Sequence, residues 1–429
     1  MGLRIIYGKA GCGKSSFCFS EISKLIKTDE KIFIVTPEQF SFTAEKKLME
    51  CVNQNAVINA EVITLSRMAY RVMGEVGNNG NSNLSKAAKA MIMNYILDIN
   101  KQKLKFLGKS DQNIDLSIQA ITEFKKHGIT VDDLKQNIEN IENKYLKTKL
   151  NDMLLIYENF ENHISNKYID DTDLLTYLAQ NIDKVDLIKN SIIYIDEFMG
   201  FTTQEYSIIK KFIQIAKQVN ICLCIDNLNP ASNPITDIFY SNKLTLYKLI
   251  NLIQENNLKL EEPVQLNKLP RFKNKELKHL EKNIYNTQST NYEENVENIK
   301  LFLAKNQYSE VENVAKNITK LVKHNNLRYK EISVITKDMN SYSSLIRAIF
   351  NKYDIPVFID EKRDLNQNII IKYILGLLEV ISKNFSYDSV ISYIKTGFCG
   401  IEEDEIFKLE NYCTKWGIKY SKWKNDFEY

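Results

Sequence analysis

The first part of the chain alternates between short runs of consecutive apolar residues and stretches in which apolar residues recur at helical spacing. The apolar runs predict five buried strands, at 5–7, 31–36, 62–65, 191–198 and 219–225. The helical spacing predicts helices around 17–26, 44–49, 68–72 and 208–215. Strands that are buried on both faces and alternate with helices are typical of a parallel sheet, so the pattern predicts an α/β domain.

Residues 84–171 interrupt this alternation, because they contain helical patterns and no strand pattern. We therefore expect a helical insertion in the α/β domain, preceded by a Gly- and Asn-rich loop over 74–83. Several lysines of the insertion could contact phosphates, although a solvated helix face is the stronger expectation in a lysine-rich chain. They are Lys101, Lys103, Lys105, Lys109, Lys125 and Lys126.

Residues 226–298 are rich in Pro, Asn and Lys and predict connecting loops with one helix near 244–254. The alternation then returns, with strands expected at 299–303, 332–336 and 355–360 and helices between them. This predicts a second α/β unit that is started but not completed, followed by helices from 366 onward. The expected domains are 1–83 with 172–290, the insertion 84–171, and 291–429.

The strand at 5–7 leads into a loop that matches Gly-x-x-x-x-Gly-Lys-Ser at Gly8, Gly13, Lys14 and Ser15. In this motif the backbone N–H groups surround phosphate oxygens, Lys14 reaches the β- and γ-phosphates, and Ser15 binds Mg²⁺. The helix that follows adds the positive end of its dipole. The candidate ATP-binding residues are Gly8, Lys9, Ala10, Gly11, Cys12, Gly13, Lys14, Ser15 and Ser16.

A second chemical signal lies at Asp196 and Glu197, where an apolar strand ends in two acidic residues. Such a pair is the usual companion of a phosphate-binding loop, with the Asp holding Mg²⁺ through water and the Glu polarising the attacking water. We therefore expect Glu197 and Lys14 to be catalytic, and Ser15 and Asp196 to bind the metal ion. The expected chemistry is ATP hydrolysis.

The composition indicates an ordinary globular protein and does not identify its binding partners. A hydrophobic content of 44% and a charged content of 26% are ordinary for a globular chain, and a net charge of +3 argues neither for nor against nucleic-acid binding. Without an apolar run of membrane-spanning length or a signal peptide, we expect a cytoplasmic protein. Seven scattered cysteines support neither zinc nor an iron–sulfur cluster, and Cys222 and Cys224 are expected in the core of a strand.

Taken together, these motifs resemble those of superfamily 1 helicases. The loop 10–15 is similar to their first motif, and 170–175 with 194–198 is similar to the stretch that leads into their second motif. More specifically, 35–39 (Val-Thr-Pro-Glu-Gln) and 64–69 (Thr-Leu-Ser-Arg-Met-Ala) are similar to the AddB (RexB) family, one of the two subunit types of the AddAB (RexAB) helicase–nucleases. The resemblance extends to about residue 397.

This resemblance implies two RecA-like domains, the first a P-loop NTPase with a helical insertion, and the second only begun in this chain. It implies a heterodimer with an AddA-type motor subunit, and action on double- and single-stranded DNA during resection of broken ends for recombinational repair. In that family the nuclease and an iron–sulfur cluster lie far toward the C-terminus, so neither is carried over to these residues.

The chain also departs from active motors of the superfamily. Met199 and Gly200 follow the acidic pair where Gln-Asp is usual, and 226–229 (Asp-Asn-Leu-Asn) stands where a Gly-Asp-x-x-Gln motif couples ATP to bases. Lys337 replaces a stacking arginine, and an ammonium cannot stack on adenine as a planar guanidinium does. ATP binding is therefore expected, whereas translocation is not supported.

Three functions remain open at this point. The first is an ATP- and DNA-binding helicase-like part of an AddB-type subunit. The second is a structural module that holds DNA and keeps only a vestigial nucleotide site. The third, an autonomous helicase, is disfavoured by the missing third motif and the incomplete second domain.

Overall fold

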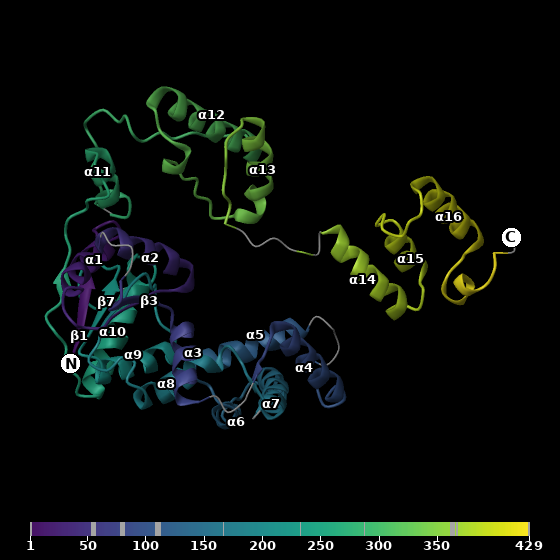
Figure 1. The fold of residues 1–429 in the computed structure, drawn as a ribbon, viewed down its shortest axis with the longest axis horizontal. Coiled ribbons are helices and arrows are strands. Elements are labelled where there is room, and N and C mark those ends of the chain that lie inside the picture. Colours follow the sequence, from purple (N-terminus) through teal and green to yellow (C-terminus); the bar gives the residue numbers. More distant parts are fainter. Residues whose placement is uncertain are drawn as a thin grey trace. The chain divides into compact units, whose positions relative to one another are not determined.

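A computed structural model of the chain describes residues 2–52, 57–77, 82–107, 113–165, 167–231, 233–286, 288–360, 365 and 368–427. The chain divides into two compact units, Met1–Ile299 and Lys300–Tyr429. Figure 1 shows the elements of both. Among the described residues, none of the helices combines the length and the apolar character that a membrane span requires.

The larger unit is built on a six-stranded sheet whose pairings are all parallel. The strand order is β3-β2-β6-β7-β1-β8. The strands are β1 (Leu3–Tyr7), β2 (Ile32–Val35), β3 (Ala60–Ile63), β6 (Ile192–Ile195), β7 (Gln218–Leu223) and β8 (Val264–Gln265). The predicted α/β class and parallel sheet are therefore confirmed, and each of the five predicted strands is present.

Helices pack on both faces of this sheet, because successive residues of a strand point to opposite sides. Ile6, Ile34 and Tyr194 pack with α1 and α2 on one face, whereas Ile5 and Val35 belong to the core of the other face. That other core includes residues of α3, α8, α9 and α10. The helices are α1 (Lys14–Leu25), α2 (Glu38–Val52), α3 (Leu65–Val76), α8 (Asp173–Asn181), α9 (Thr203–Ile215) and α10 (Tyr240–Glu255).

The order of the strands brings three loops to one edge of the sheet. In a parallel sheet the carboxyl ends of all strands lie at the same edge, and ligands bind there where the connections diverge. From β1 the chain crosses past β7 and β6 to β2, while β8 pairs with the other side of β1. The loops that follow Tyr7, Ile195 and Leu223 therefore lie close together.

The predicted helical insertion has a hydrophobic core of its own, with Met93, Ile121, Ile156 and Phe160 at its centre. Its helices are α4 (Lys86–Ile99), α5 (Asn113–Lys126), α6 (Val131–Glu139) and α7 (Lys144–Ile164). Two short strands, β4 (Ser82–Asn83) and β5 (Tyr168–Ile169), pair in parallel where the chain enters and leaves the bundle. They were not predicted, because two residues make no periodic pattern.

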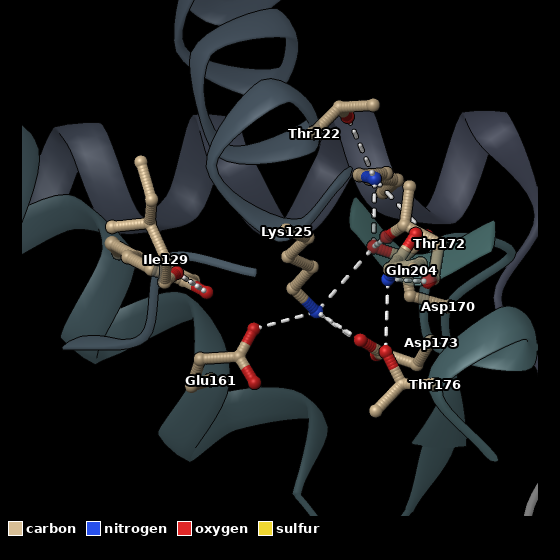
Figure 2. A network of polar contacts seen from close by, with 11 residues as sticks. Thr122, Lys125, Ile129, Glu161, Asp170, Thr172, Asp173, Thr176 and Gln204 are labelled. Carbon is tan, nitrogen blue, oxygen red and sulfur yellow. Dashed lines mark hydrogen bonds and ion pairs between the residues drawn. The ribbon is translucent and has the colours of Figure 1, made fainter. Parts of the chain in front are cut away.

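A buried ionic network joins the insertion to the start of α8 (Figure 2). The Lys125 ammonium lies 2.7 Å from the Glu161 carboxylate, 2.9 Å from Asp173 and 3.6 Å from Asp170. The Lys89 ammonium lies 2.8 Å from Asp170. Two cations of α4 and α5 are thus neutralised by carboxylates from α7, from Asp170 and from the first residue of α8.

Lys101, Lys103 and Lys105 are exposed, as a solvated helix face predicts. Lys125 departs from both expectations, because its side chain is only 4% exposed and is neither solvated nor free to contact phosphates. Burial alone would lower its pKa, but the carboxylates of Asp173 and Glu161 raise it above the ordinary value. Lys109 lies outside the described residues. The Asp170–Asp173 stretch, which resembles a helicase motif, thus anchors the insertion electrostatically.

The segment between β7 and the smaller unit also differs from the prediction. The predicted helix near 244–254 is α10, but two further elements lie in what was expected to be loop. They are β8 and α11 (Lys275–Asn283). β8 is only two residues long and exists because it pairs with the end of β1, a long-range contact that local patterns do not reveal.

The smaller unit contains helices and no strand within its described residues, which corrects the predicted second α/β unit. The segments 300–303, 332–336 and 355–360 have no strand pairing, although Ile332 keeps an extended φ of −113°. A strand needs a neighbour that pairs its N–H and C=O groups. The helices are α12 (Gln307–Asn325), α13 (Met339–Lys352), α14 (Ile369–Ser382), α15 (Tyr387–Ile394) and α16 (Glu403–Trp416).

Candidate functional site

The loop between β1 and α1 has a shape that only glycine allows at three positions. Gly11 and Gly13 have φ values of 83° and 89°, in the left-handed region. At Gly8, a Cβ atom would lie 2.5 Å from the carbonyl oxygen of Leu266 and 2.7 Å from the Cys12 sulfur. The three glycines therefore allow both the conformation of the loop and the close approach of Leu266 to it.

The first turn of α1 is open toward this loop. Its N-cap residue is Gly13, and no side chain caps its N–H groups. By contrast, Thr64 and Ser85 cap α3 and α4 through their hydroxyl oxygens. The first N–H groups of a helix have no partner within the helix, so those of α1 are available to bind an anion.

The ammonium group of Lys14 is held by its own loop. Its Nζ donates to the carbonyl oxygens of Gly8, at 2.9 Å, and Lys9, at 3.1 Å. Both acceptors are neutral and carry only partial charge. A phosphate oxygen would be a stronger acceptor for this cation, because hydrogen bonds between ionised groups are roughly twice as strong.

The structure places Asp196 and Glu197 against the loop, although they are far from it in sequence. The Ser15 hydroxyl donates to the Glu197 carboxylate at 3.3 Å. Asp196, with 7% of its surface exposed, accepts a hydrogen bond from the Glu197 N–H at 2.9 Å. Glu197 has φ of 66°, a left-handed backbone that residues with a side chain adopt rarely and often at functional sites.

A cavity of about 590 Å³ lies between the loop and this acidic pair. Of the predicted binding residues, Gly8 and Lys9 line a neighbouring cavity of about 750 Å³, and Cys12 is buried. The other six predicted loop residues and both acidic residues line the first cavity. The complete lining is Ala10, Gly11, Gly13, Lys14, Ser15, Ser16, Lys47, Asp196, Glu197, Phe198, Met199, Cys222, Cys224, Pro270 and Arg271.

Arg271 is a candidate residue that the sequence motifs missed. A Cβ atom on Gly11 would lie 3.1 Å from the Arg271 Cβ and 3.3 Å from its Nε, so the two residues are in close contact. Arg271 follows β8, in the segment that was expected to be a connecting loop. The guanidinium side chain gives the cavity a second cation beside Lys14, and its only sequence signal was that arginine is rare in this chain.

Asp226, three residues beyond the end of β7, forms an ion pair outside the candidate site. Asp226 stands where the coupling motif of active helicases would be, and its carboxylate lies 3.1 Å from the Lys243 ammonium of α10. Lys243 also pairs with Asp237, at 2.9 Å. This ion pair gives Asp226 a local structural role, and Asp226 lines the cavity of about 750 Å³ rather than the one that Asp196 and Glu197 line.

The two cysteines that line the cavity, Cys222 and Cys224, are free of disulfide bonds. Cys222 is buried, and its sulfur lies 3.3 Å from that of Cys18. The hydrogen bond with Cys18, together with burial, raises the pKa of Cys222, which favours the neutral thiol. Cys224 is only half-buried and lies just beyond the end of β7, so the expectation of a core position is correct for Cys222 alone.

The donor set fits a magnesium ion only together with a nucleotide. Within the described part of the chain, no three His, Cys, Asp or Glu side chains gather to hold a metal ion. Ser15 and Asp196 supply the hard oxygen atoms that Mg²⁺ prefers, and Mg²⁺ usually completes its shell with water and phosphate oxygens. The open loop, the uncapped helix and the two oxygen donors therefore fit a Mg²⁺-bound polyphosphate.

Comparison with known proteins places the chain beside DNA-processing enzymes. Residues 5–281 match the family described as "ADDB, N-terminal", and residues 266–429 match the "UvrD-like helicase C-terminal domain". A protein of Clostridium botulinum (strain Loch Maree / Type A3), named as the B-type subunit of an ATP-dependent helicase/deoxyribonuclease, is 42% identical over 99% of this chain. Proteins of the same name from Clostridium kluyveri and Caldanaerobacter subterraneus are each 40% identical, over 99% and 100% of the chain. The chain spans 38% of the length of each of these three relatives.

Proposed function

Because the chain belongs to the family of AddB N-terminal regions, we propose that it is the ATP- and DNA-binding, helicase-like part of a B-type helicase–nuclease subunit. The observation that carries this proposal is the cavity in which the glycine-rich loop, the open end of α1 and the Asp196–Glu197 pair meet. The names of the relatives, which describe ATP-dependent helicase/deoxyribonuclease subunits, support the same class of activity.

In this proposal the loop binds the phosphates of ATP. The N–H groups of the loop and of the first turn of α1 donate to the phosphate oxygens, and Lys14 leaves its carbonyl acceptors to contact them. Arg271 adds a second positive charge from the segment that follows β8. A bound Mg²⁺ ion would neutralise phosphate charge, with Ser15 and Asp196 as its protein ligands.

Glu197 is the proposed residue that orients the attacking water and accepts its proton. Its carboxylate now accepts a hydrogen bond from Ser15, and this bond must be exchanged before Ser15 can serve a metal ion. The hydrogen bond from its own N–H to Asp196 fixes the backbone at this point. Lys14 is the proposed partner of the negative charge that develops on the phosphates.

We also propose the domain organisation that the resemblance implies. Residues 1–83 and 172–290 form a RecA-like P-loop domain, 84–171 form its insertion, and 291–429 begin a second helicase-like domain. The order of strands around β1 and the separate core of the insertion support the first two assignments. The match to a UvrD-like C-terminal domain supports the third.

The proposed context is the cytoplasm, in a heterodimer with an AddA-type motor subunit that resects double-stranded DNA ends for recombinational repair. The word "subunit" in the names of the relatives supports a partner. DNA contacts are proposed to run through backbone phosphates and base stacking, so binding should weaken steeply as salt concentration rises.

The test of the nucleotide site is the substitution Lys14→Ala. We expect the wild-type chain to bind ATP with Mg²⁺, and the variant to lose at least about tenfold in affinity, because the phosphates lose a charged partner. Titration of a fluorescent ATP analogue measures both constants. Equal affinities in the two proteins would show that the loop is not the nucleotide site.

The second candidate is a DNA-holding module with a vestigial nucleotide site. The engagement of Asp226 by Lys243, in place of a coupling motif, favours this alternative. ATP hydrolysis should be measured with and without DNA, for the chain alone and with its motor subunit. A DNA-stimulated rate that falls at least about a hundredfold in Glu197→Gln would exclude the vestigial alternative.

A further inference from the structure

Lys47 reaches the candidate nucleotide site from a helix to which the sequence motifs assign no chemistry. It lies on α2, one turn beyond Thr43, and lines the cavity of about 590 Å³ together with Lys14. It also lines a small adjoining cavity of about 20 Å³, which holds the buried hydroxyl of Thr36. Ser15, Asp196 and Glu197 line both cavities as well.

The positive charge of Lys47 has no interaction partner among the described residues. Lys47 is half-buried, and among the described residues its ammonium forms no hydrogen bond or ion pair. The neighbouring Lys46 differs, because it points to solvent, with 68% of its side chain exposed, and lies 4.0 Å from Glu50. Thr36 Oγ1 in the small cavity is likewise buried without a hydrogen-bond partner among the residues that the structure describes. A cation and a polar atom thus face this wall of the site without protein partners.

The position of Lys47 suits a contact with the terminal phosphate of a nucleoside triphosphate. The glycine-rich loop and Lys14 hold the phosphate chain from one side. Glu197 must lie next to the γ-phosphate if it is to orient the attacking water. Because Lys47 lines both cavities together with Glu197, a γ-phosphate placed beside Glu197 would lie near Lys47.

We propose that Lys47 is a phosphate-binding residue that contacts the γ-phosphate and so distinguishes nucleoside triphosphates from diphosphates. This inference rests on the proposed ATP site. It adds a third cation to the cavity, beside Lys14 and Arg271, and gives α2 a direct contact with the one group that hydrolysis removes. Loss of the γ-phosphate releases Lys47, so α2 is the element whose contacts change with the nucleotide state.

The experiment compares Lys47→Gln with Lys46→Gln, which removes the same charge from the adjacent, solvent-exposed position. Dissociation constants of the full chain are measured with Mg²⁺ for a non-hydrolysable ATP analogue and for ADP. We expect Lys47→Gln to weaken the triphosphate analogue by roughly tenfold to a hundredfold, the range for a charged hydrogen bond, and to change ADP by less than about twofold. Lys46→Gln should leave both constants unchanged, and Lys47→Arg should restore part of the preference.

Equal losses for both nucleotides, or no loss for either, would overturn the role of Lys47. Lys14→Ala separates this outcome from failure of the site itself. If Lys14→Ala loses nucleotide binding while Lys47→Gln behaves as wild type, the site stands and the inference about Lys47 fails. If the wild-type chain and Lys14→Ala bind equally, the proposed site and the inference fail together. An unchanged urea midpoint in Lys47→Gln ensures that a lost affinity does not reflect unfolding.

Discussion

Asp170 belongs to the stretch that resembles helicases and also stabilises the fold through buried ion pairs. Burial alone would raise its pKa, but the hydrogen bonds from Lys89 lower it below the ordinary value. The carboxylate is 3% exposed and lies within 4 Å of both Lys89 and Lys125. It therefore holds two cations of the insertion at the point where the chain returns to the sheet (Figure 2).

We predict that Asp170→Asn lowers the free energy of unfolding by roughly 3–5 kcal/mol at neutral pH, because it leaves the buried Lys89 ammonium without a counter-charge. As pH falls, the unfolded state binds a proton at Asp170 before the folded state does, since the folded pKa is lowered. The difference between wild type and variant should thus be complete above about pH 3.9 and shrink as the pH falls through the lowered folded pKa.

Urea unfolding followed by circular dichroism, over a range of pH, measures this difference. Asp171→Asn is the matched control, because Asp171 is the adjacent carboxylate and is exposed. Its effect should stay within about 0.5 kcal/mol. A loss of stability in Asp171→Asn as large as that in Asp170→Asn would contradict the role assigned to the network.

At the scale of elements, the junction of β1 and α1 depends on a close approach between two backbones. Gly8 lies against the Leu266 carbonyl of the segment that follows β8, so the loop and this segment share one wall. β8 itself is only two residues long and is held by its pairing with Ile6 and Tyr7. A side chain at position 8 should therefore displace both the phosphate-binding loop and the segment that carries Arg271.

We predict that Gly8→Ala lowers the free energy of unfolding by about 1–3 kcal/mol, because its Cβ would lie 2.5 Å from a backbone oxygen. ATP affinity should fall with it, at least about tenfold. Gly74→Ala in α3 is the control, since a Cβ there meets no atom within 4 Å. Alanine in a helix is favoured over glycine by up to about 1 kcal/mol, so this variant should be as stable as wild type or more stable.

Thermal unfolding and nucleotide titration measure the two effects. If Gly8→Ala proves as stable as the wild type and binds ATP equally well, the close packing of the loop against Leu266 is not as described.

At the scale of the whole chain, the two units differ in how completely their apolar residues are covered. The sheet of the larger unit is covered by helices on both faces. In the smaller unit, Leu301, Ile335 and Phe358 belong to segments without strand pairing and have 100%, 92% and 89% of their surfaces exposed. We therefore expect low solubility or dependence on a partner, because exposed apolar side chains favour association.

We predict that Ile335→Lys changes the free energy of unfolding by less than about 0.5 kcal/mol and raises solubility, because the Ile335 side chain is exposed and is not part of a hydrophobic core. Ile349→Lys, at a position that is 1% exposed within the core of α12 and α13, should cost at least about 3 kcal/mol. Urea unfolding and precipitation limits measure both. Equal destabilisation by the two substitutions would mean that Ile335 is covered in solution.

The sequence by itself determined the five long strands of the larger unit and most of its helices. A strand buried on both faces must be apolar throughout, so 31–36 and 191–198 were recognisable without a partner. The glycine-rich loop was recognisable because its conformation needs glycine at fixed positions, as the φ values of Gly11 and Gly13 show. The α/β class followed from these local requirements. The family resemblance rested on the motifs at 10–15, 35–39 and 64–69, and the family is now shown.

Only the tertiary structure decided which distant residues meet. Arg271 and Lys47 enter the cavity through β8 and α2, and Lys125 becomes buried through carboxylates on other helices. The predicted strand at 332–336 has no pairing, because a strand depends on a neighbour as well as on its own residues. Local patterns reflect what each segment can form, whereas charge pairing and sheet pairing depend on what packs beside it.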